Sequence, residues 1–175
     1  MAAPPCSQQA FSLPEMALVT ALLGLLVAFA LPLSNQLGQQ TYADTLRDQL
    51  TSHLQFARTQ AVLRGQAQQV CGASNGNACD GDWRRHWLIT DAWGHISRRV
   101  DLARPSTLCW QGFGDQSVRF YSNGTSSSSN GRFSLCQAGR LVWQLILNRQ
   151  GRLRRSDADD LAAPQGSCCG QTLAG

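Results

Sequence analysis

The first 65 residues carry two successive hydrophobic patterns, and both indicate helix. No charged residue lies between Met16 and Leu33, a stretch just long enough to cross the apolar part of a bilayer as a helix. Farther on, apolar residues recur at steps of three or four, which marks one face of an α-helix. These residues are Leu46, Leu50, Leu54, Ala57 and Ala61. The patterns predict one helix from Phe11 to about Arg64, apolar all round in its first half, amphipathic in its second, and ended by Gly65.

From residue 66 onward, short apolar or alternating runs separated by Gly, Asn and Ser predict strands. The expected strands are Ala67–Cys71, His86–Asp91, Ile96–Leu102, Ser117–Tyr121, Gly131–Cys136, Arg140–Asn148 and Gly151–Arg154. We expect residues 122–130, which are rich in serine, to form a flexible loop, and the segment after Ser156 to be irregular. The whole pattern predicts an α+β fold, in which the amphipathic half of the long N-terminal α-helix packs on mostly antiparallel β-sheet, with Trp87 and Trp143 in the core.

The positive charge of the chain is concentrated after the apolar stretch. All 15 basic residues are arginines, against 11 acidic residues, and the formal net charge is +4. No basic residue precedes Arg47, and the last acidic residues come together as Asp157, Asp159 and Asp160. The segment between them is therefore more basic than the whole chain, which favours a polyanion or an anionic surface as a partner.

Seven cysteines are present, of which one precedes the apolar stretch. The other six are Cys71, Cys79, Cys109, Cys136, Cys168 and Cys169. This even set predicts disulfides in an oxidising compartment. We expect a local bridge between Cys71 and Cys79, and a bridge from Cys136 to Cys168 or Cys169. Because the spacing does not fit the paired ligands of a zinc site, we expect no metal and no cofactor.

Glu15, the only glutamate of the chain, lies at the front edge of the apolar stretch. A carboxylate deep in a membrane costs on the order of a few kcal/mol, so we expect a positively charged partner. The segment Met1–Ala10, followed by Phe11, an apolar run and Glu15, resembles the prepilin signature of type IV pilins and type II secretion pseudopilins. This resemblance implies that a prepilin peptidase cleaves between Ala10 and Phe11 and methylates the new amine. It also implies that Glu15 pairs with the N-terminus of a neighbouring subunit.

The same resemblance divides the chain into four parts: a cleaved leader (1–10), a transmembrane and filament-core half of the helix (11–33), its amphipathic half (34–65), and a β-rich head with a C-terminal tail (66–175). It implies insertion in the bacterial inner membrane with the head in the periplasm, and then assembly with other major and minor pilins into a pilus or pseudopilus. The alternatives are a secretory signal peptide, which normally has a basic start that this chain lacks, and an ordinary single-span anchor.

Four later segments resemble, in the same order, segments of the GspH/FimT family of minor pilins and pseudopilins. They are Leu54–Gly65, Val70–Asp91, Val118–Cys136 and Leu147–Arg155. In FimT-like minor pilins of natural transformation, a C-terminal GRxR motif binds DNA. Gly151, Arg152 and Arg154 match that motif, and Arg149 and Arg155 lie beside it. The resemblance therefore implies double-stranded DNA as a partner.

The residue types of this motif suit phosphate groups. Gly151 allows a positive φ, and Arg152 and Arg154 point to one side if the chain there is extended. Two guanidinium groups on one face can bridge neighbouring phosphates, and such contacts read no sequence. The alternative is a solvated strand end, or pairing of these arginines with the aspartates downstream. For Arg84–Arg85 and Arg98–Arg99 we expect exposed structural positions.

Two functions follow from these observations. The first is a minor type IV pilin that binds DNA non-specifically for uptake in natural transformation. The second is a structural minor pilin of a priming or tip complex, or a GspH-like pseudopilin of type II secretion, with no DNA role. The sequence has no GxSxG, P-loop or GxGxxG motif, so we expect neither an enzyme nor catalytic residues.

Overall fold

The computed structural model describes residues 13–114 and 116–157, and for residues 26–37 and 157 it describes the backbone alone. The chain forms two compact units, Met1–Asp44 and Thr45–Gly175. Helix α1, Leu13–Arg64, belongs to the first unit up to Asp44 and to the second unit beyond it. The predicted helix agrees with α1 over the described residues, whereas the predicted cleavage site at Ala10 and Phe11 lies outside them.

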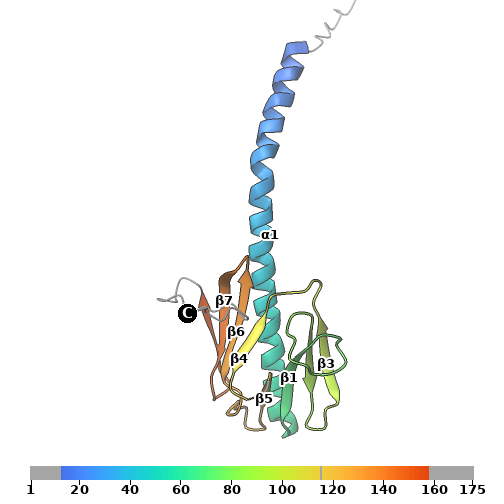
Figure 1. Cartoon of the computed structure of the whole chain (residues 1–175), viewed down its shortest axis with the longest axis vertical. Helices are drawn as coiled ribbons and strands as arrows, with labels where there is room; N and C mark the ends of the chain where they lie inside the picture. Colours follow the sequence, from blue (N-terminus) through green and yellow to red (C-terminus); the bar gives the residue numbers. More distant parts are fainter. Residues whose placement is uncertain (1–12, 115, 158–175) are drawn as a thin grey trace, which may run out of the picture. The chain divides into compact units, whose positions relative to one another are not determined.

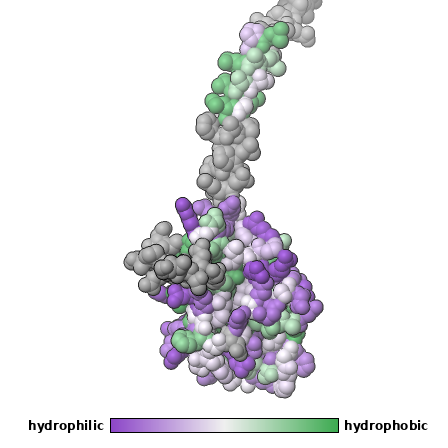
Figure 2. Space-filling view, viewed as in Figure 1, coloured by the Kyte–Doolittle hydropathy of each residue, from purple (hydrophilic) through white to green (hydrophobic). Residues whose placement is uncertain are grey.

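The part of α1 in the first unit exposes large apolar side chains. They include Leu13, Met16, Leu18, Val19, Leu22, Leu23 and Leu25, and Figure 2 shows the apolar surface along this stretch. Glu15 lies in the first turn of the helix and is exposed. Within the described residues, no helical stretch combines the length and the hydropathy of a membrane span. The span predicted for residues 11–33 reaches beyond those residues.

The part of α1 in the second unit buries the apolar face that the sequence predicts. Leu46, Leu50, Leu54, Ala57 and Ala61 are all buried. The helix ends as predicted at Gly65. There the backbone N–H of Gln66 donates to the carbonyl of Ala61 (3.2 Å), and the N–H of Gly65 donates to the carbonyl of Val62 (3.3 Å). These two bonds pair carbonyl groups that a helix end leaves without partners.

Two antiparallel four-stranded sheets form the rest of the second unit (Figure 1). The first sheet has the order β3-β2-β1-β5, with β1 Gln68–Ala73, β2 His86–Thr90, β3 Ile96–Asp101 and β5 Ser117–Phe120. The second sheet has the order β4-β6-β7-β8, with β4 Cys109–Gly112, β6 Gly131–Gln137, β7 Arg140–Leu147 and β8 Leu153–Asp157.

The predicted α+β fold is confirmed. The prediction missed β4 and began β8 at Gly151, which instead lies in the turn before that strand.

Aromatic side chains join the two sheets in the core. Trp83, which precedes β2, packs edge to face on Phe133 of β6, with 4.7 Å between the ring centroids. Trp87 is buried and donates its indole N–H to the carbonyl of Trp83 (2.9 Å). Trp143 is also buried, so both tryptophans predicted for the core lie there. Such pairs add about 0.5–1.5 kcal/mol to the burial of their area.

The serine-rich segment between β5 and β6 is fixed, so the expectation of a flexible loop is wrong. Ser126 and Ser129 are buried. The backbone N–H of Arg119 donates to the Ser129 hydroxyl (2.8 Å), and the Ser126 hydroxyl donates to the Arg119 carbonyl (3.0 Å). Here the hydroxyl groups supply the partners that the backbone of an irregular segment would otherwise lack.

The predicted local disulfide is present. Cys71 and Cys79 are bonded, with 5.5 Å between their Cα atoms. Cys109 and Cys136 each take part in a disulfide as well. The other two candidates, Cys168 and Cys169, lie outside the described residues, so the predicted bridge from Cys136 to one of them stays a prediction.

Candidate functional site

The turn between β7 and β8 carries the predicted motif, and its shape depends on Gly151. The N–H of Gly151 donates to the carbonyl of Asn148 (3.0 Å), and the N–H of Arg152 donates to the side-chain Oδ1 of Asn148 (2.9 Å). Gly151 has a φ of 74°, and a Cβ atom there would lie 2.4 Å from the carbonyl oxygen of Gly124. The predicted positive φ is confirmed, and the close approach of Gly124 excludes a side chain as well.

Arg58 of α1 fastens this turn to the helix. Its Nε donates to the carbonyl of Gly124 (2.9 Å), and its Nη2 donates to the carbonyl of Gln150 (3.3 Å). The N–H of Ser126 donates to the carbonyl of Arg149 (2.9 Å). The turn therefore rests on the helix and on the serine-rich loop, and its backbone holds the arginines that follow in place.

Strand register brings a third arginine to the same face of the second sheet. Leu153 pairs with the buried Leu147, so Arg154 projects from the opposite, outer face. Arg152 precedes β8, but the N–H of Asn148 donates to its carbonyl (3.1 Å) and continues the ladder, which places Arg152 on the same face. Arg154 pairs with Ile146, which in turn pairs with Arg132 of β6. Since neighbouring strands are about 4.8 Å apart, Arg132 and Arg154 are separated by roughly 10 Å. We call Arg132, Arg152 and Arg154 together the arginine face.

The side chains of the arginine face are exposed. None of them makes a hydrogen bond or an ion pair with another residue in the described part of the chain. Arg149 is exposed at the same end of the sheet, with its Nε 3.5 Å from Oδ1 of Asn130. Arg155 pairs in register with the buried Leu145, so it projects from the other face, and it takes part in an interaction of its own. The register thus separates Arg155 from the other predicted arginines.

Two arginines in and beside the first sheet, Arg84 and Arg99, in contrast have carboxylate partners. Arg84 forms a two-pronged pair with Asp82, with 2.8 Å from Nε to Oδ1 and 2.7 Å from Nη2 to Oδ2. The hydrogen bond from Arg84 holds the pKa of the Asp82 carboxyl below its usual value. Arg99 donates through Nε to Oδ1 of Asp101 (2.6 Å). That bond, and a second one from His86, lower the pKa of Asp101.

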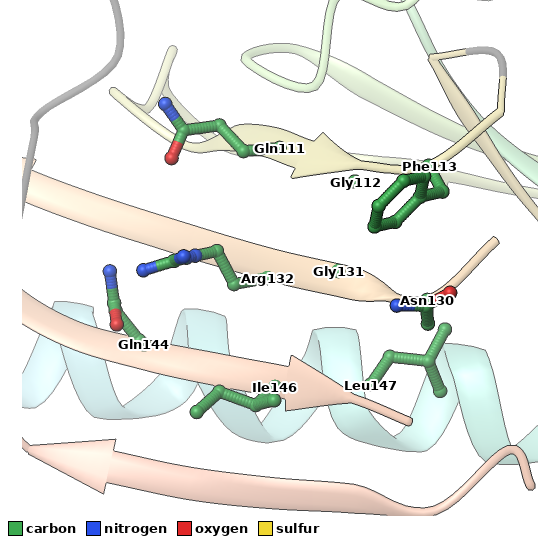
Figure 3. Close-up of a pocket in the computed structure, with 9 residues that line it drawn as sticks. All are labelled: Gln111, Gly112, Phe113, Asn130, Gly131, Arg132, Gln144, Ile146 and Leu147. Carbon is green, nitrogen blue, oxygen red and sulfur yellow. The ribbon is translucent and has the colours of Figure 1, made fainter. Parts of the chain in front are cut away.

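A shallow groove of about 430 Å³ lies on the outer face of the second sheet, beside the arginine face (Figure 3). It is lined by Gln111, Gly112, Phe113, Asn130, Gly131, Arg132, Gln144, Ile146 and Leu147. Phe113 lies at one end, and Gln111, Arg132 and Gln144 lie at the other, with α1 behind the sheet. Sequence reasoning missed this groove. Alternation along the predicted strand 131–136 could have placed Arg132 on the face of the sheet opposite to that of Phe133. Phe113 could not have been placed, because it follows a strand that was not predicted.

His53 of α1 is a buried titratable group away from this face. It is 1% exposed, and neither ring nitrogen has a hydrogen-bond partner among the described residues. Burial, and then the charge of Arg98, lower the pKa of His53 to about 4, so the ring is neutral at pH 7. The described residues contain no group of three or more side chains that could hold a metal ion.

Comparison with known proteins gives a family and a related fold. Residues 47–151 match the family described as "Type II transport protein GspH". Two crystal structures of the type IV minor pilin FimU of Pseudomonas aeruginosa strain PAO1 are similar to this chain. One is 26% identical, with a TM-score of 0.54, over 70% of this chain and 92% of that chain. The other is 25% identical, with a TM-score of 0.53, over 70% and 98%.

No curated protein matches the chain. The family match, however, spans more than half of the sequence, and the helix packed on antiparallel sheets agrees with the fold of a solved minor pilin. The chain therefore belongs to the GspH family and is a minor pilin or pseudopilin of the GspH/FimT kind.

Proposed function

We propose that this minor pilin binds DNA non-specifically through its arginine face, for uptake in natural transformation. One observation carries the proposal: Arg132, Arg152 and Arg154 share one exposed face, and none of them pairs with a carboxylate among the described residues. Guanidinium groups without internal partners keep their donors for phosphate oxygens. Because phosphates are the same at every base pair, such a face binds without reading the sequence.

The fixed backbone of the β7–β8 turn supports the same proposal. Arg58 ties the turn to the helix, and Gly151 lets it lie against Gly124. A preorganised surface loses less conformational freedom on binding than a flexible one. Arg149 adds a further cation at this end of the sheet. With three or four phosphate contacts, we expect a Kd for duplex DNA of roughly 1–100 μM at physiological salt.

In this proposal the head is carried by a pilin-type anchor. A prepilin peptidase removes residues 1–10, and the helix from Phe11 enters the bacterial inner membrane, with the head in the periplasm. Glu15 pairs with the N-terminus of a neighbouring pilin when the filament assembles. The exposed apolar side chains of α1 in the first unit support this part of the proposal, because they need a membrane or other helices around them.

A second candidate is a structural subunit of a pilus tip or of a type II secretion pseudopilus, without a DNA role. The description of the matching family as a type II transport protein favours it. A structural subunit needs protein interfaces and has no use for the arginine face. The two functions therefore predict different results when Arg152 and Arg154 are removed: DNA binding is lost only if the first function is correct.

The test is a binding titration with the full chain in a non-ionic detergent and a fluorescent DNA duplex at low and moderate salt. Arg152→Ala/Arg154→Ala removes two charges from the arginine face. Arg84→Ala/Arg99→Ala removes the same number of charges from the first sheet and is the matched control. We expect the first variant to bind at least about tenfold more weakly, while the control keeps its affinity within about twofold.

Equal binding by both variants, or no binding by the parent protein, would overturn the DNA function and leave the structural subunit. Circular dichroism and thermal unfolding of each variant check that the fold is retained. Both exchanged sites are exposed, and such substitutions usually change stability by less than about 0.5 kcal/mol.

A further inference from the structure

Phe113 is the exposed aromatic residue at the end of the groove on the second sheet. Its side chain is 69% exposed, and its N–H donates to the carbonyl of Asn130 (2.9 Å), which continues the β4–β6 ladder past Gly112. By this register Phe113 projects from the same outer face as Gln111 and lies diagonally across from Arg132. Diagonal neighbours in such a ladder are about 7–8 Å apart, so the ring and the guanidinium group can contact one ligand.

The groove between these residues offers hydrogen-bonding groups beside the ring. Gln111 is exposed and Asn130 half-buried. Gln144 donates from Nε2 to the Ser134 hydroxyl (3.0 Å), which fixes its amide at the other end of the groove. In Figure 3 the Arg132 side chain extends along β6 toward Gln144. The volume of about 430 Å³ lies within the usual range of roughly 300–1,000 Å³ for sites that hold small ring systems.

The combination of a flat aromatic ring, amide groups and unpaired arginines on one sheet surface suits single-stranded nucleic acid. An unpaired base can stack on an aromatic side chain while its phosphates lie against arginines. The bases of a duplex are already stacked on one another, so a duplex can use the arginines but not the ring. Charge also favours this occupant, because the described groove lining contains a guanidinium group and no carboxylate.

We infer that Phe113 and the groove beside it bind an unpaired base, so that the protein binds single-stranded DNA more tightly than duplex DNA. This inference rests on the proposed function, because the same arginine face supplies the phosphate contacts. Arg132 lies between the base site and the other two arginines and contacts the phosphate next to the bound base. Single strands or frayed ends are then the preferred substrate of this face.

The experiment compares labelled single-stranded and duplex DNA of the same length, titrated with the full chain in a non-ionic detergent. We expect Phe113→Ala to weaken single-strand binding by roughly tenfold and duplex binding by less than about twofold. Phe113→Leu keeps an apolar side chain without a ring, and we expect it to lose single-strand affinity as Phe113→Ala does. Phe113→Trp keeps a stacking surface and is expected to bind single strands as well as the parent does.

Trp93 provides the matched control for an exposed aromatic residue. It is 67% exposed in the β2–β3 hairpin of the first sheet, and Trp93→Ala should leave binding of both DNA forms unchanged. If duplex and single strand bind equally, and Phe113→Ala changes neither, the base site is wrong while the proposed function stands. If neither DNA form binds the parent, both fail. If Phe113→Ala disturbs filament assembly and not DNA binding, the groove contacts protein, and the inference is overturned.

Discussion

Two groups of arginines in the head differ in whether they have carboxylate partners. On the first sheet, Arg84 and Arg99 are held by Asp82 and Asp101 at distances of 2.6–2.8 Å. On the second sheet, the arginine face has no such pairs among the described residues. The net charge of +4 therefore says little about where a polyanion binds. The distribution of the aspartates matters more, because a paired guanidinium group has its charge offset by the carboxylate and has fewer donors left for a phosphate.

The first prediction concerns the buried His53, which is affected by an arginine of the first sheet. Burial, and then the charge of Arg98, lower the pKa of His53 to about 4, and Arg98 itself lies over the ring of Phe56 at 4.5 Å. Below pH 6.5 His53 becomes protonated in the unfolded state but stays neutral in the folded state. The free energy of unfolding therefore falls as the pH is lowered toward 4. Between pH 7.5 and pH 4.5 this group should cost about 2–3 kcal/mol in the free energy of unfolding.

Urea unfolding of the parent and of His53→Phe at the two pH values measures this cost. The variant keeps an aromatic ring beside Trp87, whose ring centroid is 6.1 Å from that of His53, but it cannot titrate. Its loss of stability on acidification should be smaller by the stated amount. An identical loss in the two proteins would mean that His53 is not the group that responds to acid in this range.

The second prediction sharpens the comparison through the backbone that supports the arginine face. Gly151→Ala leaves every arginine in place but meets both an unfavourable φ and the Gly124 carbonyl. It should cost about 1–3 kcal/mol of stability and weaken DNA binding several-fold. Gly139, in the β6–β7 turn, has a similar φ of 75° with open space around it, so Gly139→Ala should cost about 1 kcal/mol and leave binding intact. Thermal unfolding and DNA titration of both variants measure these effects, and an equal loss of binding in the two would contradict the prediction.

The third prediction breaks the comparison by giving the second sheet a carboxylate of its own. Ile146 is half-buried between Arg132 and Arg154 in the register. Ile146→Glu should pair with these arginines and weaken duplex binding roughly tenfold. In Ile146→Gln the new side chain has nearly the shape of glutamate but no charge, so this variant should bind duplex DNA close to the parent level. A titration that finds the two variants alike would show that the shape of the groove, and not its charge, controls affinity.

The fourth prediction breaks the comparison in the opposite direction and has the smallest effect. Asp82→Asn keeps an oxygen acceptor for the backbone N–H of Arg84, which Asp82 accepts at 3.0 Å, but it removes the charge that pairs the guanidinium group. The freed arginine should raise duplex affinity by about twofold. Adding Arg84→Ala to Asp82→Asn should abolish the gain. The double variant has the same net charge as the parent, so a gain that persists in it would show that the freed arginine is not the cause and would contradict the prediction.

Much of the fold could be predicted because local patterns carry it. The step of three and four through Leu46, Leu50 and Leu54 identified the buried face of α1, and Gly65 identified its end. Strands such as β2 and β7 begin where the sequence predicted and end one residue earlier. The strand β4, Cys109–Gly112, was missed because its sequence CWQG shows no alternation, whereas the equally short β5 alternates polar and apolar residues in SVRF. The pairing of β4 with β6 comes from tertiary structure and not from any local alternation.

The site was predictable only in part, because some of its residues come together only through tertiary structure. Gly151, Arg152 and Arg154 are contiguous, so a short motif was enough to propose them. Arg132 and Phe113 join them through sheet register across β4, β6, β7 and β8, which the sequence does not display. The serine-rich loop was mistaken for a flexible one because its composition is that of a linker. The buried hydroxyl groups of Ser126 and Ser129 instead bind the backbone of Arg119.

The most direct test of the central claim is the salt dependence of duplex binding. Each phosphate contact contributes a slope of about −0.9 to a plot of log affinity against log salt. The three residues of the arginine face predict a slope of roughly −3 for the parent protein and roughly −1 for Arg152→Ala/Arg154→Ala. Arg84→Ala/Arg99→Ala should keep the parent slope. A parent slope that survives the loss of Arg152 and Arg154, or that falls in the control instead, would contradict the account.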